Sequence, residues 1–232
     1  MNRNPYLLVL ACVVFPCTCA NEFFTVGEAA HTDKVTNHAY HHIYHLHLRW
    51  LKHKPVRLLE IGLGCTMNTG SASIELWQKY FPEVDLYMAD IDTACAAKVQ
   101  HLLKNKVLIG DQGSKADLQR WTEESGGAFD VIVDDGSHQP LHQLLSFEVL
   151  FEHALKPGGV YFIEDIESET RTICAPYAPE RLSRDKILYW IDQLLIIPRS
   201  AVVDVPPGLM AITCQREACA FLKCPADEPR CP

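Results

Sequence analysis

The sequence is short of basic residues and of long apolar segments. Its 232 residues include 21 Lys and Arg against 29 Asp and Glu, which gives a formal net charge of −8. A nucleic-acid-binding protein needs Lys and Arg to neutralise phosphates, so this balance argues against one. No apolar run approaches the ~20 residues that a bilayer-spanning helix requires. The length allows one domain with at most a small appendage.

Glycine is missing at one informative position. The segment LLEIGLGC contains Gly62 and Gly64, but Met67 stands where a G-x-G-x-x-G motif has its third glycine. This substitution argues against a nicotinamide-dependent oxidoreductase. Glu60, which precedes the two glycines, suits a cofactor that carries an amino or sulfonium cation. Tight strand-to-helix turns also use glycine for packing, so the turn alone leaves the function open.

The first twenty residues have the order of a secretory signal peptide. Arg3 precedes an apolar run at residues 6–15, and small residues follow at Thr18 and Ala20. We therefore expect residues 1–20 to be cleaved and the protein to enter the secretory pathway, either secreted or held in the endoplasmic reticulum lumen. After cleavage, no stable membrane span would remain. The alternative is a buried N-terminal strand or helix, since apolar runs of this length are ambiguous.

Ten cysteines are many for a chain of this size. Three lie in the expected signal, and four others crowd into the last nineteen residues, at Cys214, Cys219, Cys224 and Cys231. In an oxidising compartment, this crowding favours one or two disulfides that fix the C-terminus. A zinc site is the alternative, although the spacings differ from those of common zinc modules.

From residue 56 onward, short β-branched runs alternate with helical patterns. Strands are expected at 56–61, 84–89, 107–109, 129–133 and 160–163, and helices at 73–80, 93–103, 115–124 and 140–155. This alternation is typical of βαβ units with a parallel sheet between helices. A helix at 184–195 and strands at 202–205, 209–214 and 218–222 would complete the sheet with an antiparallel edge. Residues 21–54 are expected to form a mostly helical lid segment ahead of a domain at 55–232 that ends in the cysteine-rich tail.

Polar side chains follow the second and third strands where a nucleoside-bearing cofactor needs them. Asp90 ends the second strand, where a carboxylate can accept hydrogen bonds from both ribose hydroxyls. Asp111 and Gln112 follow the third strand, within reach of an adenine edge. Helix N-capping is the alternative for each acid, and for Asp92 it is the preferred interpretation.

The densest group of candidate catalytic residues follows the fourth and fifth strands. Asp134, Asp135 and His138 lie in VDDGSHQPLHQLLSF, and Glu164 and Asp165 end KPGGVYFIED. Neighbouring parallel strands end at one edge, so these groups should converge. Asp135, Glu164 and Asp165 offer three oxygen ligands that suit Mg²⁺. Because no Lys or Arg lies nearby in the sequence, repulsion among the carboxylates favours a bound cation over a solvated acidic edge.

Six histidines lie between residues 31 and 47. His38 and His42, and likewise His41 and His45, have the i, i+4 spacing that places a pair on one helix face. This pattern suggests a second metal site or a pH-responsive lid. The alternative is a polar helix that covers the cofactor.

Several motifs together resemble the macrocin/mycinamicin O-methyltransferase family of class I S-adenosylmethionine enzymes. The resemblance spans residues 32–166 and is carried by TDKVTNHAYHHIY, LEIGLG, YMADID, IGDQGS, VIVDDGSH and LKPGGVYFIED. It implies a Rossmann-like three-layer α/β sandwich with a mostly parallel seven-stranded sheet and an antiparallel edge. It also implies a divalent metal and methyl transfer to a sugar hydroxyl on a natural product.

The resemblance implies a role for each candidate residue. It gives the metal to Asp135, Glu164 and Asp165, the role of general base to His138, and the cofactor to Glu60, Gly62, Gly64, Asp90, Asp111 and Gln112, with Asp134 near its methionine end. Within the first motif, Thr32, Asp33, Lys34, His38 and Tyr40 are expected to shape the cofactor or substrate pocket.

The expected cofactors are S-adenosyl-L-methionine and Mg²⁺ or another divalent cation, and the expected partner is a small molecule with a free hydroxyl. A homo-oligomer is compatible with the sequence. The alternative function is a secreted, non-catalytic binding protein that retains the methyltransferase fold. Such a protein has no need to keep Asp135, His138, Glu164 and Asp165 together, and all four are present.

Overall fold

A computed structural model describes residues 21–65, 71–166, 182–195 and 204–228. The expected signal peptide at residues 1–20 lies outside the described residues. Within the described part of the chain, no helix combines the length and apolar character needed to cross a membrane.

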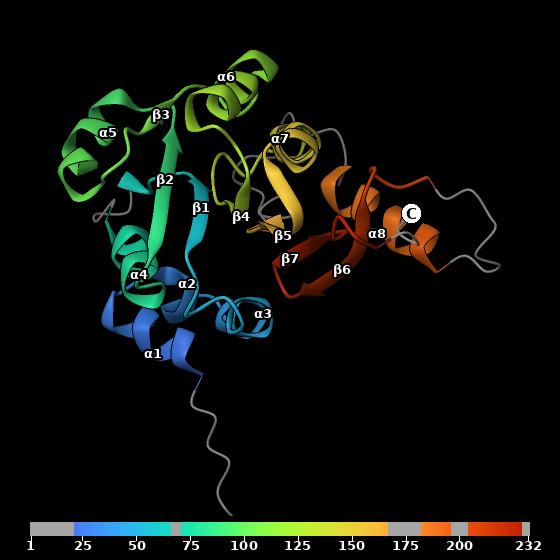
Figure 1. The fold of residues 1–232 in the computed structure, drawn as a ribbon, viewed down its shortest axis with the longest axis horizontal. Coiled ribbons are helices and arrows are strands. Elements are labelled where there is room, and N and C mark those ends of the chain that lie inside the picture. The colour runs from blue at the N-terminus through green and yellow to red at the C-terminus, as the bar shows by residue number, and fades with distance from the viewer. Residues whose placement is uncertain (1–20, 66–70, 167–181, 196–203, 229–232) are drawn as a thin grey trace, which may run out of the picture.

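The described strands form one seven-stranded sheet with the order β3-β2-β1-β4-β5-β7-β6 (Figure 1). The strands are β1 (Val56–Ile61), β2 (Val84–Asp90), β3 (Leu108–Ile109), β4 (Phe129–Asp134), β5 (Leu155–Ile163), β6 (Leu209–Gln215) and β7 (Ala218–Lys223). The first five are parallel to one another, whereas β7 is antiparallel to both β5 and β6. The expected mostly parallel sheet with an antiparallel edge is confirmed.

Helices cover both faces of the sheet and make three layers. The helices are α1 (Glu22–Ala29), α2 (Asp33–Thr36), α3 (His41–Leu48), α4 (Ala72–Tyr80), α5 (Thr93–Val99), α6 (Lys115–Ser125), α7 (Pro140–His153) and α8 (Leu182–Leu194), with a 3₁₀ turn at Gln100–Leu102. Successive strand residues point to opposite faces, so Leu58 packs with the helices α1, α3 and α4, while Leu59 packs with α6, α7 and α8. The sheet is therefore buried on both sides.

Some expected elements differ from those observed. The single helix expected at 93–103 ends at Val99 and continues as a 3₁₀ turn, and β5 begins at Leu155 rather than at residue 160. Of the strand expected at 202–205, residues 204 and 205 are irregular and the other two lie outside the described residues. His38 precedes α3, which begins at His41, so His38 and His42 do not share a helix.

Two disulfides have both cysteines in the described part of the chain. Cys214–Cys219 closes the hairpin between β6 and β7, which confirms the expected disulfide near the C-terminus. Cys65–Cys95 is a pairing that the spacing did not indicate, because its cysteines follow two different strands. Cys224 is disulfide-bonded as well.

Candidate active site

A cavity of about 1140 Å³ opens at the carboxyl edge of the parallel strands. It is lined by the turns after β1 to β5, by residues 31–33 and 36–38 of the N-terminal segment and by the turn between β6 and β7. Ligands of open α/β sheets bind at this edge. Its volume is ample for a small-molecule ligand, whose pockets measure about 300–1,000 Å³.

The glycine turn after β1 brings the backbone close to the neighbouring strand end. Gly62 has a φ of +98°, and a Cβ atom there would lie 2.1 Å from the carbonyl oxygen of Asp135. Its N–H donates to the carbonyl of Ala89 at 2.8 Å. Only glycine fits this position, both for its conformation and for the space. Gly64 has a φ of +62° and also lines the cavity.

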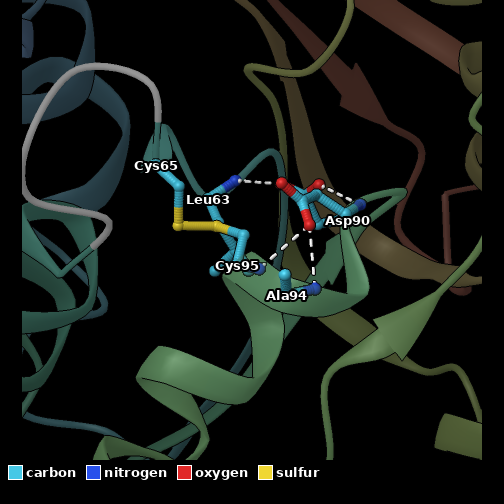
Figure 2. Close-up of a disulfide and its surroundings, with 6 residues drawn as sticks. Leu63, Cys65, Asp90, Ala94 and Cys95 are labelled. Atoms are coloured by element: carbon cyan, nitrogen blue, oxygen red, sulfur yellow. Dashed lines mark hydrogen bonds between the residues drawn. A yellow bond between two sulfur atoms is a disulfide. The ribbon is translucent and has the colours of Figure 1, made fainter.

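Asp90 lies where β2 ends, at the wall of the cavity (Figure 2). Its Oδ2 accepts the N–H of Leu63 at 2.8 Å and its Oδ1 accepts the N–H of Asp92 at 2.7 Å. Asp92, in contrast, caps α5 by accepting the N–H groups of Ala94 and Cys95. The N-cap expected at Asp92 is therefore confirmed, and Asp90 remains at the cavity wall.

The Cys65–Cys95 disulfide lies directly beside Asp90 and spans the same corner of the cavity (Figure 2). It joins the turn after β1 to the first turn of α5, and both cysteines line the cavity. Two covalently tied loops therefore form one wall.

Asp111 and Gln112 lie in the turn after β3, and both line the cavity. Gln112 donates from Nε2 to both carboxylate oxygens of Asp134, at 2.6 and 2.7 Å, and its Oε1 accepts the N–H of Ser137 at 2.9 Å. Asp134 is fully buried and also accepts from the hydroxyl of Ser146 at 2.6 Å. Burial raises the pKa of Asp134 to about 6. Asp134 therefore lies behind the cavity wall, and its expected place near the methionine end of the cofactor stays a prediction.

A buried lysine from the N-terminal segment lies among the carboxylates. Lys34 of α2 is 1% exposed, and its Nζ lies 2.5 Å from Glu164 Oε2, 2.6 Å from Asp135 Oδ2 and 3.0 Å from Glu60 Oε1. Burial by itself lowers the pKa of Lys34, but the three carboxylates outweigh it and raise the pKa well above its ordinary value. The expectation that these acids lack a counter-cation is wrong, because Lys34 is distant in sequence and close in space.

We call the group formed by Lys34, Glu60, Glu164 and the Oδ2 of Asp135 the buried ion network. Two residues expected in the site, Glu60 and Glu164, belong to it. Glu60 also accepts from the indole N–H of Trp77 at 2.6 Å, and Glu164 accepts from the hydroxyl of Tyr44 at 2.5 Å. Neither carboxylate lines the cavity. The structure therefore brings Glu60 to Lys34 rather than to the cofactor pocket, and it holds Glu164 behind the cavity wall.

Three other side chains, Asp135, His138 and Asp165, form what we call the rim group. All three line the cavity, and each offers a ligand atom within 4.8 Å of the others. His138 Nε2 lies 3.6 Å from Asp165 Oδ2 and 4.0 Å from Asp135 Oδ1. His138 and Asp165 have left-handed φ values of +55° and +53°, a costly backbone conformation that is found most often at functional sites.

The rim group fits a divalent cation by its donor atoms and its charge. Mg²⁺ is commonly held by one or two carboxylates together with water and substrate oxygens, and Asp135 and Asp165 supply two. Burial raises the pKa of Glu60 and of Glu164, whereas the nearby Lys34 lowers it. Lys34 is one cation in contact with three carboxylates, and a cation at the rim group would offset their remaining negative charge.

Sequence comparisons relate the chain to sugar O-methyltransferases. No family model matches it. It is 38% identical over 129 residues to the 8-demethyl-8-(2-methoxy-alpha-L-rhamnosyl)-tetracenomycin-C 3'-O-methyltransferase of Streptomyces olivaceus, covering 53% of this chain and 31% of that protein. It is 36% identical over 127 residues to the mycinamicin VI 2''-O-methyltransferase of Micromonospora griseorubida, covering 53% and 30%. The match to the demethylmacrocin O-methyltransferase of Streptomyces fradiae is 35% over 125 residues, again covering 53% and 30%.

The structure is similar to the MycE methyltransferase from the mycinamycin biosynthetic pathway in complex with Mg, SAH and mycinamycin VI. The TM-score is 0.72 at 27% identity, covering 89% of this chain and 54% of that one. The chain therefore spans about a third of the curated relatives and about half of MycE. By sequence and by fold, the chain is similar to the macrocin/mycinamicin-type S-adenosylmethionine-dependent O-methyltransferases.

Proposed function

We propose that this chain is an S-adenosylmethionine-dependent, divalent-metal-assisted O-methyltransferase that acts on a hydroxyl of a sugar or small natural product. The observation that carries the proposal is a single cavity with two differently equipped sides. One side has the glycine turn and Asp90, and the other has the rim group. The relatives that methylate sugars on tetracenomycin and mycinamicin support this acceptor class.

The cofactor side is suited to hold an adenosyl group. Asp90 is fixed by two backbone N–H donors, and its carboxylate oxygens retain lone pairs that can accept from ribose hydroxyls. Gly62 allows the backbone to approach closely, and Asp111 and Gln112 bound the adjacent wall. The proposal therefore places the adenosyl group between the turns after β1, β2 and β3.

In the proposed reaction, the members of the rim group have two roles, which are to hold a cation and to accept a proton. When bound, S-adenosylmethionine supplies an electrophilic methyl group and a divalent cation lowers the pKa of a hydroxyl that contacts it. Asp135 and Asp165 would hold the cation, since Mg²⁺ prefers oxygen to nitrogen ligands. The imidazole of His138 is then left to accept the proton of the hydroxyl. Glu164 supports the site indirectly, because it holds Lys34 against Asp135.

The decisive test combines binding with transfer. Calorimetry of the purified chain with S-adenosylhomocysteine should show saturable binding, and methyl-labelled S-adenosylmethionine should label members of a panel of rhamnosides and related glycosides. Chelation with EDTA should reduce labelling and leave cofactor binding in place. Absence of heat and of thermal stabilisation by either cofactor form would contradict the proposal. Cofactor binding with no transfer to any acceptor would favour the non-catalytic alternative.

The compartment is part of the proposal and rests on different observations. The signal-like residues 1–20 and the two disulfides both support passage through the secretory pathway. Expression of the full sequence in a eukaryotic secretory host should give a product that begins near Asn21, by mass spectrometry of its N-terminus. Retention of an uncleaved chain in the cytosol would contradict it.

A further inference from the structure

A second group of metal-ligating side chains lies beside the rim group and shares Asp165 with it. His38, Asp165 and Glu217 each offer one ligand atom, these atoms lie within 4.8 Å of one another, and all three residues line the cavity. We propose that this group, the second triad, binds a divalent transition-metal cation adjacent to the cation proposed at Asp135 and Asp165. Only the pairing with that first cation rests on the proposed function.

The carboxylate of Asp165 faces both groups with different oxygens. Its Oδ1 lies 3.9 Å from His38 Nδ1, whereas its Oδ2 lies 3.6 Å from His138 Nε2. The hydroxyl of Tyr40 donates to Oδ1 at 2.7 Å and accepts the N–H of Asp165 at 3.2 Å, which fixes the orientation of the carboxylate. A shared carboxylate suits two-metal sites, whose cations lie about 3.5–4 Å apart. Asp165 is therefore in position to serve both cations.

The other two members of the second triad are already close enough to share an ion. His38 Nδ1 is hydrogen-bonded to Glu217 Oε2 at 2.8 Å, close to the separation of adjacent ligand atoms around one octahedral cation, which would replace the shared proton. The His38 ring is stacked on Tyr40, with centroids 4.8 Å apart and an interplanar angle of 16°. Arg216 approaches only the other oxygen of Glu217, at 3.6 Å, and is 83% exposed. The imidazole and the Oε2 atom are thus held together at the cavity wall.

The scaffold around Glu217 is rigid. Glu217 occupies the turn of the β6–β7 hairpin with a left-handed φ of +69°, and its carbonyl accepts the N–H of Ile166 at 3.0 Å. The Cys214–Cys219 disulfide closes this hairpin. Gln215 ties the hairpin to the N-terminal segment, because its Oε1 accepts the N–H of Ile43 and its Nε2 donates to the carbonyl of Ala39, both at 3.0 Å. A preorganised turn loses little freedom on binding an ion.

The donor atoms select the kind of cation. Each group has two carboxylates and one imidazole, but the proposed function uses His138 for proton transfer, so only the second triad adds a nitrogen ligand. Imidazole nitrogen suits transition-metal cations better than it suits Mg²⁺. The two positions should therefore differ in their response to excess Mg²⁺.

The test is a titration of the metal-free full chain with Mn²⁺, in which calorimetry measures the number of bound ions and electron paramagnetic resonance measures their coupling. We expect two Mn²⁺ per chain with a spin-coupled spectrum, and excess Mg²⁺ should displace one of them. Glu217→Gln and His38→Gln should each bind one Mn²⁺ with an uncoupled spectrum. Asp165→Asn should weaken both positions at least tenfold. Glu148→Gln, which removes an exposed acid from α7, serves as the matched control and should bind two.

Two outcomes would overturn the second site. One is that the unmodified chain binds a single Mn²⁺ and that both Glu217→Gln and His38→Gln still bind it. The other is that both variants still bind two Mn²⁺. Thermal unfolding of each metal-free variant shows whether it is folded, and the two substitutions lie in different segments, so one can stand in for the other. If Asp135→Asn leaves ion binding unchanged while Glu217→Gln abolishes it, the metal-assisted part of the proposed function fails and the second site stands.

Discussion

Two neighbouring groups of acids in this protein deal with negative charge in opposite ways. In the buried ion network, the side chains of Glu60 and Glu164 are at most 2% exposed and contact Lys34 directly. In the rim group, the side chains of Asp135 and Asp165 are 26% and 27% exposed and face the cavity. Asp135 belongs to both, with Oδ2 on Lys34 and Oδ1 toward His138.

The difference shows which acids are available for chemistry. Buried carboxylates need a partner inside the protein, since an unpaired buried charge is strongly unfavourable. Carboxylates that line the cavity need no partner inside the protein, because water solvates them until a ligand binds. The buried ion network therefore shapes the wall, while the rim group provides the reactive surface.

Removing the cation from the buried ion network should have the largest effect. Lys34→Met leaves three carboxylates without their shared partner, so we expect a loss of about 3–5 kcal/mol in the free energy of unfolding, measured by urea denaturation. Adding Glu60→Gln should recover part of the loss. Lys79→Met, which breaks the exposed pair with Glu75 on α4, should cost less than about 0.5 kcal/mol. A similar small loss for Lys34→Met would remove the distinction between the two groups.

The rim group should show the reverse pattern, with activity lost and stability kept. His138→Ala should lower the rate of methyl transfer by about 10²–10⁴-fold, the usual contribution of a general base. Affinity for S-adenosylhomocysteine and the unfolding midpoint should change little. The exposed His153 on α7 provides the control substitution, His153→Ala. Retention of more than a tenth of the activity in His138→Ala would assign the proton to another group.

A substitution on the cofactor side of the cavity should change the affinity for the cofactor. Asp90→Asn keeps the shape and removes the charge that ribose hydroxyls would contact, so the affinity for S-adenosylhomocysteine should fall about 10–100-fold by calorimetry. Asp227→Asn, at an exposed position, should leave the affinity unchanged. An unaltered affinity for Asp90→Asn would mean that Asp90 only holds the backbone of Leu63 and Asp92.

The pH dependence of stability should reveal the buried Asp134. Burial raises its pKa from 3.8 to about 6, so the folded state holds this proton more tightly than the unfolded chain. Its stabilising contribution is complete below pH 3.8 and is lost as the pH rises through about 6. Between pH 5 and pH 7, Asp134→Asn should therefore reduce the decline in unfolding free energy by on the order of 1–2 kcal/mol. Equal slopes for the two proteins would contradict this pKa.

The sequence was sufficient to predict most of the fold and the location of the site. Alternating β-branched and helical segments are local patterns, and they placed each parallel strand within a few residues. The carboxyl ends of such strands meet at one edge, so Asp90, Asp111, Asp135 and Asp165 could be assigned to it. The direction of each side chain could not be predicted from the sequence. Glu60, Asp134 and Glu164 lie at the same edge but point into the interior.

What only the tertiary structure decided is the pairing of charges across the chain. Lys34 reaches Asp135 and Glu164 over separations of 101 and 130 residues, and His38 reaches Glu217 over 179. These contacts depend on how the N-terminal segment and the last hairpin pack against the sheet, which no local period encodes. The sequence by itself determined a mostly parallel sheet with acids at its edge, since alternating strands and helices are local patterns and parallel strands end at one edge. The structure alone separated the acids that are neutralised inside from those left to bind, because burial and charge pairing are properties of the packed molecule.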